Sequence, residues 1–252
     1  MNIINCNMLT DTQLNEIEAF INSNSFNNTI SFLENDMNYF EDFPCFFMAY
    51  DHQTLIGFLS VFIPDSASCE IYYHISDTNK HLALEIFNAI YHELSPLLDK
   101  YQLYNKYILF DGRTDNFHLL NNTDNARFSH SECLMQYDLN HIWKNKPDKL
   151  EFDIEETEDT LIINTFLQDE FIGSSDVDIS DDYALIHNVK VIKDYRGLGY
   201  GTETIYHTIK HLKDNNYSKI LLHVNSANTI AFTMYSHHGF NIIQQIDYWK
   251  IS

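Results

Sequence analysis

The chain repeats one order of sequence patterns at a nearly constant spacing. Gly57 and Gly173 each lie inside a strand-like apolar run and are 116 positions apart, and the same spacing relates Ile75 to Val191. Two further pairs are 112 positions apart: Asn116 with Asn228, and Phe128 with Phe240. Constant offsets over long stretches indicate an internal duplication rather than a chance alignment of two mixed segments. We therefore predict two related lobes.

Each predicted lobe is a mixed α/β structure, with a mostly antiparallel twisted sheet flanked by helices. In the first lobe, residues 1–145, periodicity and cap signals predict helices at 11–22, 29–39 and 79–94, and strands at 46–50, 55–62, 69–75, 107–110 and 133–139. In the second lobe, residues 150–252, they predict strands at 161–163, 171–173, 183–191, 220–224 and 242–251, and helices at 199–212 and 229–237. The connector is 141–149. The second lobe starts with the acidic segment 151–159 and lacks the leading helices of the first.

The charge balance narrows the classes of partner. The net charge is −21, because 36 acidic residues outnumber 15 basic ones. Phosphate-backbone binding depends on Lys and Arg, so we expect no nucleic-acid partner. The sequence shows no leader pattern and no apolar run of about 20 residues, so we expect a cytoplasmic protein without a membrane partner. The charge reflects either a cationic substrate or surface solubility alone.

The residues that could bind metal do not form a metal-binding pattern. The four cysteines form no C-x-x-C pair and have no histidine at zinc spacing, and His237-His238 has no suitably spaced third ligand. We expect reduced structural thiols and no metal.

One segment carries a recognisable chemistry. The turn Arg196-Gly197-Leu198-Gly199-Tyr200-Gly201 lies between a predicted strand and a predicted helix. Glycines let the backbone adopt positive φ and approach a phosphate closely, and a helix N-terminus offers free N–H groups and a positive dipole. The spacing is Arg-x-x-Gly-x-Gly, which differs from the dinucleotide-binding G-x-G-x-x-G turn and from the P-loop. The turn therefore predicts an anion site of another kind.

This segment resembles the central motif of the GNAT-type N-acetyltransferases, and residues 191–202 match its usual form. Residues 228–240 resemble the second motif of that family: an Asn, an Ala three positions later, a Tyr four after that, and a closing Gly-Phe. The resemblance covers residues 160–252. It implies a GNAT-like fold for both lobes, in tandem, with acetyl-CoA as the co-substrate.

The resemblance also implies roles for individual residues. Val191 would offer backbone hydrogen bonds to the pantetheine arm, and the main-chain amides from Arg196 to Gly201 would hold the pyrophosphate. Asn228 would bind the coenzyme. Tyr235 would protonate the departing thiolate, for which a phenol of pKa about 10 is a competent donor. The alternative for Tyr235 is a side chain that only packs on its helix.

Direct transfer to an amine also needs a proton acceptor. His187 precedes Val191 by four residues, so we expect both on one strand face, and the unperturbed pKa of histidine, about 6.5, suits a base. A histidine satisfied by cross-strand polar contacts is an equally good interpretation, and Asp181, Asp182 or Tyr183 are alternative bases. Four aspartates cluster on the expected acceptor side: Asp176, Asp178, Asp181 and Asp182. Of these, Asp181 and Asp182 are our candidates for binding a cationic amine.

The first lobe lacks the motif residues. At the offset of 116, Lys80 stands where the second lobe has Arg196, Ala83 where it has Gly199, and Glu85 where it has Gly201; at the offset of 112, Thr123 replaces Tyr235. A carboxylate at Glu85 would repel a pyrophosphate. We expect a degenerate lobe that binds no acyl-CoA, packs on the second lobe and forms a wall of the acceptor pocket.

The sequence predicts an N-acyltransferase. It would move an acetyl group from acetyl-CoA to a primary amine of a small cationic molecule or peptide, by direct transfer in a ternary complex. The alternative is a non-catalytic CoA-binding sensor that retains the turn. A homodimer is left open.

Overall fold

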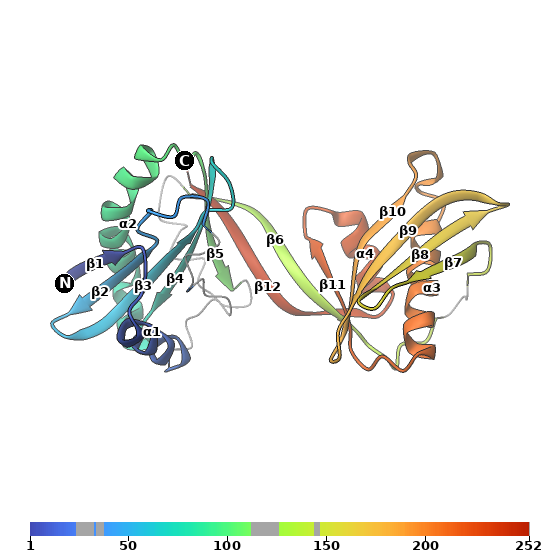
Figure 1. The fold of residues 1–252 in the computed structure, drawn as a ribbon, viewed down its shortest axis with the longest axis horizontal. Helices are drawn as coiled ribbons and strands as arrows, with labels where there is room; N and C mark the ends of the chain where they lie inside the picture. The colour runs from blue at the N-terminus through green and yellow to red at the C-terminus, as the bar shows by residue number, and fades with distance from the viewer. Residues whose placement is uncertain (24–32, 34–37, 112–125, 144–146, 252) are drawn as a thin grey trace. The chain divides into compact units, whose positions relative to one another are not determined.

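The computed structural model describes residues 1–23, 33, 38–111, 126–143 and 147–251. Most of the helix expected at 29–39 lies outside these ranges, as do the expected counterparts Asn116 and Thr123. The chain forms two compact units, residues 1–131 with 245–252, and residues 132–244 (Figure 1). The expected lobes differ from these units at residues 132–145, which belong to the second unit, and at 245–252, which belong to the first.

The first unit is a mixed sheet with helices. Its strands lie in the order β1 (Asn2–Cys6), β2 (Phe46–Asp51), β3 (Thr54–Phe62), β4 (Ser68–Ile75), β5 (Asn105–Asp111) and the end of β12 (Phe240–Ile251). All neighbours are antiparallel except β4 and β5, which are parallel. The helices are α1 (Asp11–Ser23), the 3₁₀-helix η1 (Asp77–Leu82) and α2 (Ala83–Lys100). Strand β1 was not expected from the sequence.

The second unit repeats this architecture. Its strands lie in the order β6 (Ala126–Tyr137), β11 (Ile220–Asn225), β10 (Ala184–Val191), β9 (Glu170–Ile179), β8 (Thr160–Leu167) and β7 (Glu151–Glu156). Again one pair, β10 and β11, is parallel, and the other neighbouring pairs are antiparallel. The helices are η3 (Lys193–Tyr195), α3 (Tyr200–Asp214) and α4 (Thr229–His237). The expected acidic segment forms β7. The mixed α/β fold class expected from the sequence is confirmed.

Equivalent elements keep the offset seen in the sequence. Strand β3 starts 116 residues before β9, and β4 and β10 correspond at both ends. The hairpins before β3 and β9 each carry a left-handed residue at the same relative position, His52 with φ 53° and Gln168 with φ 53°. Left-handed residues also follow α2 and α3, at Gln102 and Asn216. The two units therefore share turns as well as the order of elements.

The last strand of each sheet comes from an unexpected part of the chain: β12, at the end of the chain, completes the first sheet, and β6 completes the second. In the first unit, β5 pairs with residues 246–251 of β12, whereas in the second unit β11 pairs with residues 132–136 of β6. Sequence patterns do not distinguish these pairings, because both strands carry similar alternations of apolar and polar residues and either would fit the edge of either sheet.

The two units bury their sheets differently. In the first, strands β2, β3 and β4 contain long runs of buried residues, and Ile17 and Phe20 of α1 belong to the same core. In the second, β8 and β10 alternate buried with partly exposed residues, and the core contains Ile205, Ile209 and Leu212 of α3. One face of the second sheet therefore carries polar side chains. Among the described residues, no helix is both long and apolar enough to span a bilayer.

Candidate active site

The parallel strands β10 and β11 separate halfway along β10. They pair only at Ala184, Leu185 and Ile186, although β10 continues to Val191 beside β9. Asn188 has a left-handed φ of 48°, and the β9 register shifts by one residue between His187 and Lys190. A bulge of this kind bends a strand and ends regular pairing. It leaves the end of β10 unpaired on the side of β11.

The glycine turn follows the separated end of β10. Gly197 and Gly199 have φ values of 78° and 89°, and a Cβ atom at either would meet no atom within 4 Å. Gly199 is the N-cap of α3, and no side chain caps this helix. The first N–H groups of a helix lack intrahelical acceptors, so the backbone of the turn and the first turn of α3 present donors to open space. Gly197 and Gly199 therefore place no side chain where an anion would approach.

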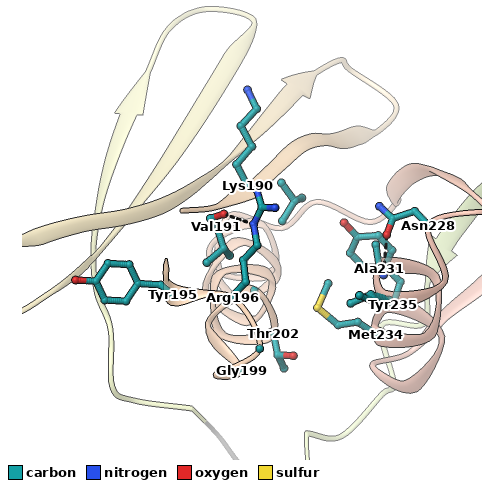
Figure 2. A pocket seen from close by; sticks show the side chains of 14 residues that line it. Lys190, Val191, Tyr195, Arg196, Gly199, Thr202, Asn228, Ala231, Met234 and Tyr235 are labelled. Carbon is teal, nitrogen blue, oxygen red and sulfur yellow. Dashed lines mark hydrogen bonds between the residues drawn. The ribbon is translucent and has the colours of Figure 1, made fainter. Parts of the chain in front are cut away.

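A cavity of about 550 Å³ lies between this turn, the end of β10 and helix α4 (Figure 2). Arg196 extends across the turn, and its Nε donates a hydrogen bond of 2.8 Å to the carbonyl of Val191. Figure 2 shows Met234 reaching from α4 toward Gly199 and Thr202. The expected residues that line the cavity are Val191, Arg196, Gly197, Gly199, Gly201, Asn228 and Tyr235.

Helix α4 contributes Asn228 and Tyr235. Asn228 is its N-cap, and its side-chain oxygen accepts a hydrogen bond of 3.3 Å from the backbone N–H of Ala231. This contact explains in physical terms why an Asn stands three residues before Ala231. Tyr235 lies one turn further along the same helix face and is only 6% exposed. Burial raises the pKa of its phenol to about 12, so it is a proton donor at neutral pH.

A second, smaller cavity of about 220 Å³ continues the opening between β10 and β11. Val189, Asn228, Ala231 and Tyr235 line both cavities. The smaller cavity is also lined by His187 and by His223 of β11. His223 is not predicted from the sequence, because an isolated histidine on a short strand carries no motif.

The expectation that His187 and Val191 share one strand face is wrong. His187 lies opposite Asp176 of β9, whereas Val191 lies opposite Gly173. These β9 partners are three residues apart, so they point to opposite faces of the sheet. The bulge at Asn188 inserts the extra residue that reverses the alternation. Nε2 of His187 forms a hydrogen bond of 2.9 Å with Oδ1 of Asp178.

Several expected residues lie apart from the cavities. Leu198 is 59% exposed, and neither Leu198 nor Tyr200 lines the larger cavity. Asp181 and Asp182 are exposed and precede β10, at the end opposite Val191. Lining residues that the sequence analysis did not single out include Tyr195, Thr202 and Met234. Within the described ranges, no cluster of three or more His, Cys, Asp or Glu side chains could hold a metal ion.

Comparisons with known proteins agree with this architecture. Residues 122–240 match the family model for the acetyltransferase (GNAT) family. Streptothricin acetyltransferase A of Bacillus subtilis is 37% identical over 65 residues, which are 26% of this chain and 37% of that protein. The match thus spans little more than a third of the length of that relative.

Two solved structures share the fold over most of the chain. A GNAT-family acetyltransferase from Colwellia psychrerythraea has a TM-score of 0.58 at 15% identity, with both chains fully covered. A tandem GNAT protein from the clavulanic acid biosynthesis pathway has a TM-score of 0.55 at 12% identity, over 81% of each chain. Residues 122–240, which contain the glycine turn and residues that line both cavities, thus match the model of the acetyltransferase (GNAT) family.

Proposed function

We propose that residues 132–244 transfer an acetyl group from acetyl-CoA to a primary amine of a small cationic molecule or peptide. The observation that carries this proposal is the larger cavity, which joins an open glycine turn at one end to the buried phenol of Tyr235 at the other. A long thioester with an anionic end fits such a site. The family match supports an acetyltransferase, and the donor and acceptor are our inference.

The residues of the turn suit the anionic end of acetyl-CoA. In the turn from Arg196 to Gly201, the amide of Arg196 donates to the carbonyl of Lys193 at 3.3 Å. The amides after it, with the uncapped N-terminus of α3, can hold a pyrophosphate by hydrogen bonds and dipole attraction. The unpaired edge of β10 near Val191 can hydrogen-bond the amide groups of the pantetheine arm. Arg196 occupies one lone pair of the Val191 carbonyl, and the second can accept a hydrogen bond from the ligand. Asn228 retains its amide Nδ2 as a further donor.

The chemistry is addition of the amine to the thioester carbonyl, followed by loss of the thiolate. Acetyl-CoA supplies the activated acyl group. Tyr235 donates its phenolic proton to the departing sulfur. Its pKa of about 12 keeps the phenol protonated at neutral pH, and it also makes Tyr235 a weaker acid than an ordinary tyrosine. His187 accepts the proton that the amine loses. No covalent bond between the enzyme and the acyl group is needed.

The acceptor would approach through the opening between β10 and β11, from the polar face of the sheet. Asp176 and Asp178 lie on this face beside His187, and their charge favours a cationic molecule. Asp181 and Asp182, at the far end of β10, would contact only the distal part of a long acceptor.

Two measurements test the proposal. Acetyl-CoA should raise the melting temperature of the protein, and free thiol should be released when an amine is added from a panel of polyamines, aminoglycosides, amino acids and peptides. Stabilisation without thiol release for any amine would support the alternative of a CoA-binding sensor. Absence of stabilisation by any acyl-CoA would contradict the proposal itself.

A further inference from the structure

His187 belongs to a hydrogen-bonded pair on the polar face of the second sheet. Its Nε2 lies 2.9 Å from Oδ1 of Asp178, on the neighbouring strand β9. The imidazole is 34% exposed and the carboxylate 58% exposed. An ionised carboxylate only accepts hydrogen bonds, so the imidazole nitrogen that faces it carries the proton. In the neutral ring, Nδ1 is then the basic atom.

A second pair fixes the backbone that carries His187. Asn188 adopts a left-handed φ of 48° in the bulge, and its Nδ2 donates a hydrogen bond of 2.9 Å to Oδ2 of Asp176. Asn is one of the few residues other than Gly that tolerate this conformation. The bulge turns His187 to the face opposite Val191 while leaving it on the wall of the smaller cavity, with Tyr235. Two aspartates of one strand therefore support a single histidine.

We infer that Asp178 is a positioning residue that holds His187 as the proton acceptor for the incoming amine. The inference rests on the proposed function and adds to it the device that orients the base. Asp176 has a different role. It accepts the hydrogen bond from Asn188 that stabilises the bulge, and the bulge determines on which face of the sheet His187 lies.

The proton balance assigns each group one step. The amine nitrogen forms a bond to the acetyl carbonyl carbon, and His187 Nδ1 takes one proton from that nitrogen. The carbon–sulfur bond then breaks, and the sulfur takes the proton of Tyr235. The imidazolium formed at His187 is stabilised by the Asp178 carboxylate at 2.9 Å.

Other titratable groups surround His187. On the neighbouring elements these are Asp176 and Asp178 of β9, His223 of β11 and Tyr235 of α4. Glu132 of β6 accepts a hydrogen bond from Asn225, which lines the smaller cavity. His223 is the rival base, because it lines the same cavity. Unlike His187, it has no carboxylate within hydrogen-bond distance among the described contacts.

The test measures kcat/KM against pH for the wild type and for Asp178→Asn, with the best amine from spermidine, kanamycin, L-lysine amide and a peptide with a free N-terminus. We expect Asp178→Asn to lower kcat/KM roughly tenfold, because the carboxylate no longer holds the imidazole of His187 in place. Asp178→Glu should restore part of the activity. His187→Asn should lose roughly 10²-fold to 10⁴-fold, the usual contribution of a general base.

Asp169→Asn is the matched control. It makes the same change of charge in the exposed β8–β9 hairpin, where φ is 65° and Asn is well tolerated. Its pH profile should superimpose on that of the wild type. A profile of Asp178→Asn that coincides with this control would overturn the positioning role, and so would an acidic limb removed by His223→Asn but not by His187→Asn. A wild type that releases no thiol with any amine would instead refute the proposed function.

Discussion

Strands β4 and β10 occupy equivalent positions in the two units, but they part from their parallel neighbours at different points. Strand β4 pairs with β5 at five successive positions, from Ser68 to Tyr72, whereas β10 pairs with β11 at three. The β3–β4 register is regular throughout, and the β9–β10 register shifts at the bulge. The bulge in β10 thus ends its pairing with β11 earlier than β4 parts from β5.

The turns that follow these two strands also differ, in the backbone conformation at which the next helix starts. Gly199 starts α3 with a φ of 89°, whereas Leu82 starts α2 with a φ of −103° after a 3₁₀-helix. In the first unit the hydroxyl of Tyr73 donates a hydrogen bond of 2.9 Å to the carbonyl of Ala83, and Ala83 is buried. The start of α2 thus lacks the positive φ of Gly199, and its first residue is enclosed. A repeat can preserve its fold through apolar patterning and still lose the local backbone deviations on which a site depends.

We expect the largest effect from a substitution in the glycine turn of the second unit. Gly199→Glu places a Cβ at a φ of 89° and a negative charge at the uncapped start of α3, so acetyl-CoA binding should be abolished. Acetyl-CoA at 100 times its Kd stabilises a native protein by about 2.7 kcal/mol, and the variant should lose this shift in thermal melting. The control Glu85→Gln, in the first turn of α2, should keep it. A full shift in Gly199→Glu would remove the turn from the site.

Tyr235→Phe tests the acid without disturbing the core. Because Tyr235 is 6% exposed and Phe fills nearly the same volume, acetyl-CoA binding should be unchanged. Turnover should fall roughly 10²-fold, the lower end of the contribution of a general acid. Because the pKa of Tyr235 is about 12, it should produce no basic limb in the wild-type profile near neutral pH. Equal turnover in the variant would leave Tyr235 with a packing role alone.

His74 gives the first unit an acid sensitivity of its own. It is fully buried where the second unit has Lys190, and burial lowers its pKa from 6.5 to about 4. Because the folded pKa is depressed, the unfolded chain binds the proton first as the pH falls, so stability is present above pH 6.5 and is lost toward pH 4. The loss should be roughly 3 kcal/mol.

Urea unfolding at several pH values measures this loss. His74→Leu should flatten the pH dependence of the unfolding free energy between pH 6.5 and pH 4, the interval set by the two pKa values. His92→Leu, an exposed change in the same unit, should leave it in place. An equally steep dependence in His74→Leu would assign the sensitivity to other groups.

The smallest effects compare two equivalent glycines. A Cβ at Gly173 would collide with the backbone carbonyl of Lys190 in the bulge, whereas a Cβ at Gly57 would meet Cγ2 of Ile86 at 2.7 Å. A backbone cannot move as a side-chain methyl can, so Gly173→Ala should cost about 2–3 kcal/mol of unfolding free energy. Gly57→Ala should change it by about 1 kcal/mol or less. Equal costs in chemical denaturation would mean that the bulge does not depend on Gly173.

Local patterns in the sequence were sufficient for the glycine turn and for most elements. Residues 196–201 carry φ requirements and free amides that depend only on nearby residues, and the strands at 184–191 and 220–225 follow from short apolar runs. The family resemblance is confirmed over residues 122–240. The roles of the individual site residues stay predictions until the experiments above are done.

The amino-acid sequence alone determined the mixed α/β class and the place of the glycine turn, because each is encoded within a few consecutive residues. It also showed the repeat at 116 residues, because similar short patterns recur at that spacing. Only the tertiary structure decided on which face His187 lies and which sheet receives the last strand. The face depends on the bulge at Asn188, which Asp176 holds from another strand. The exchange of β6 and β12 depends on pairing between residues more than 80 positions apart, where side-chain alternation gives no unique partner.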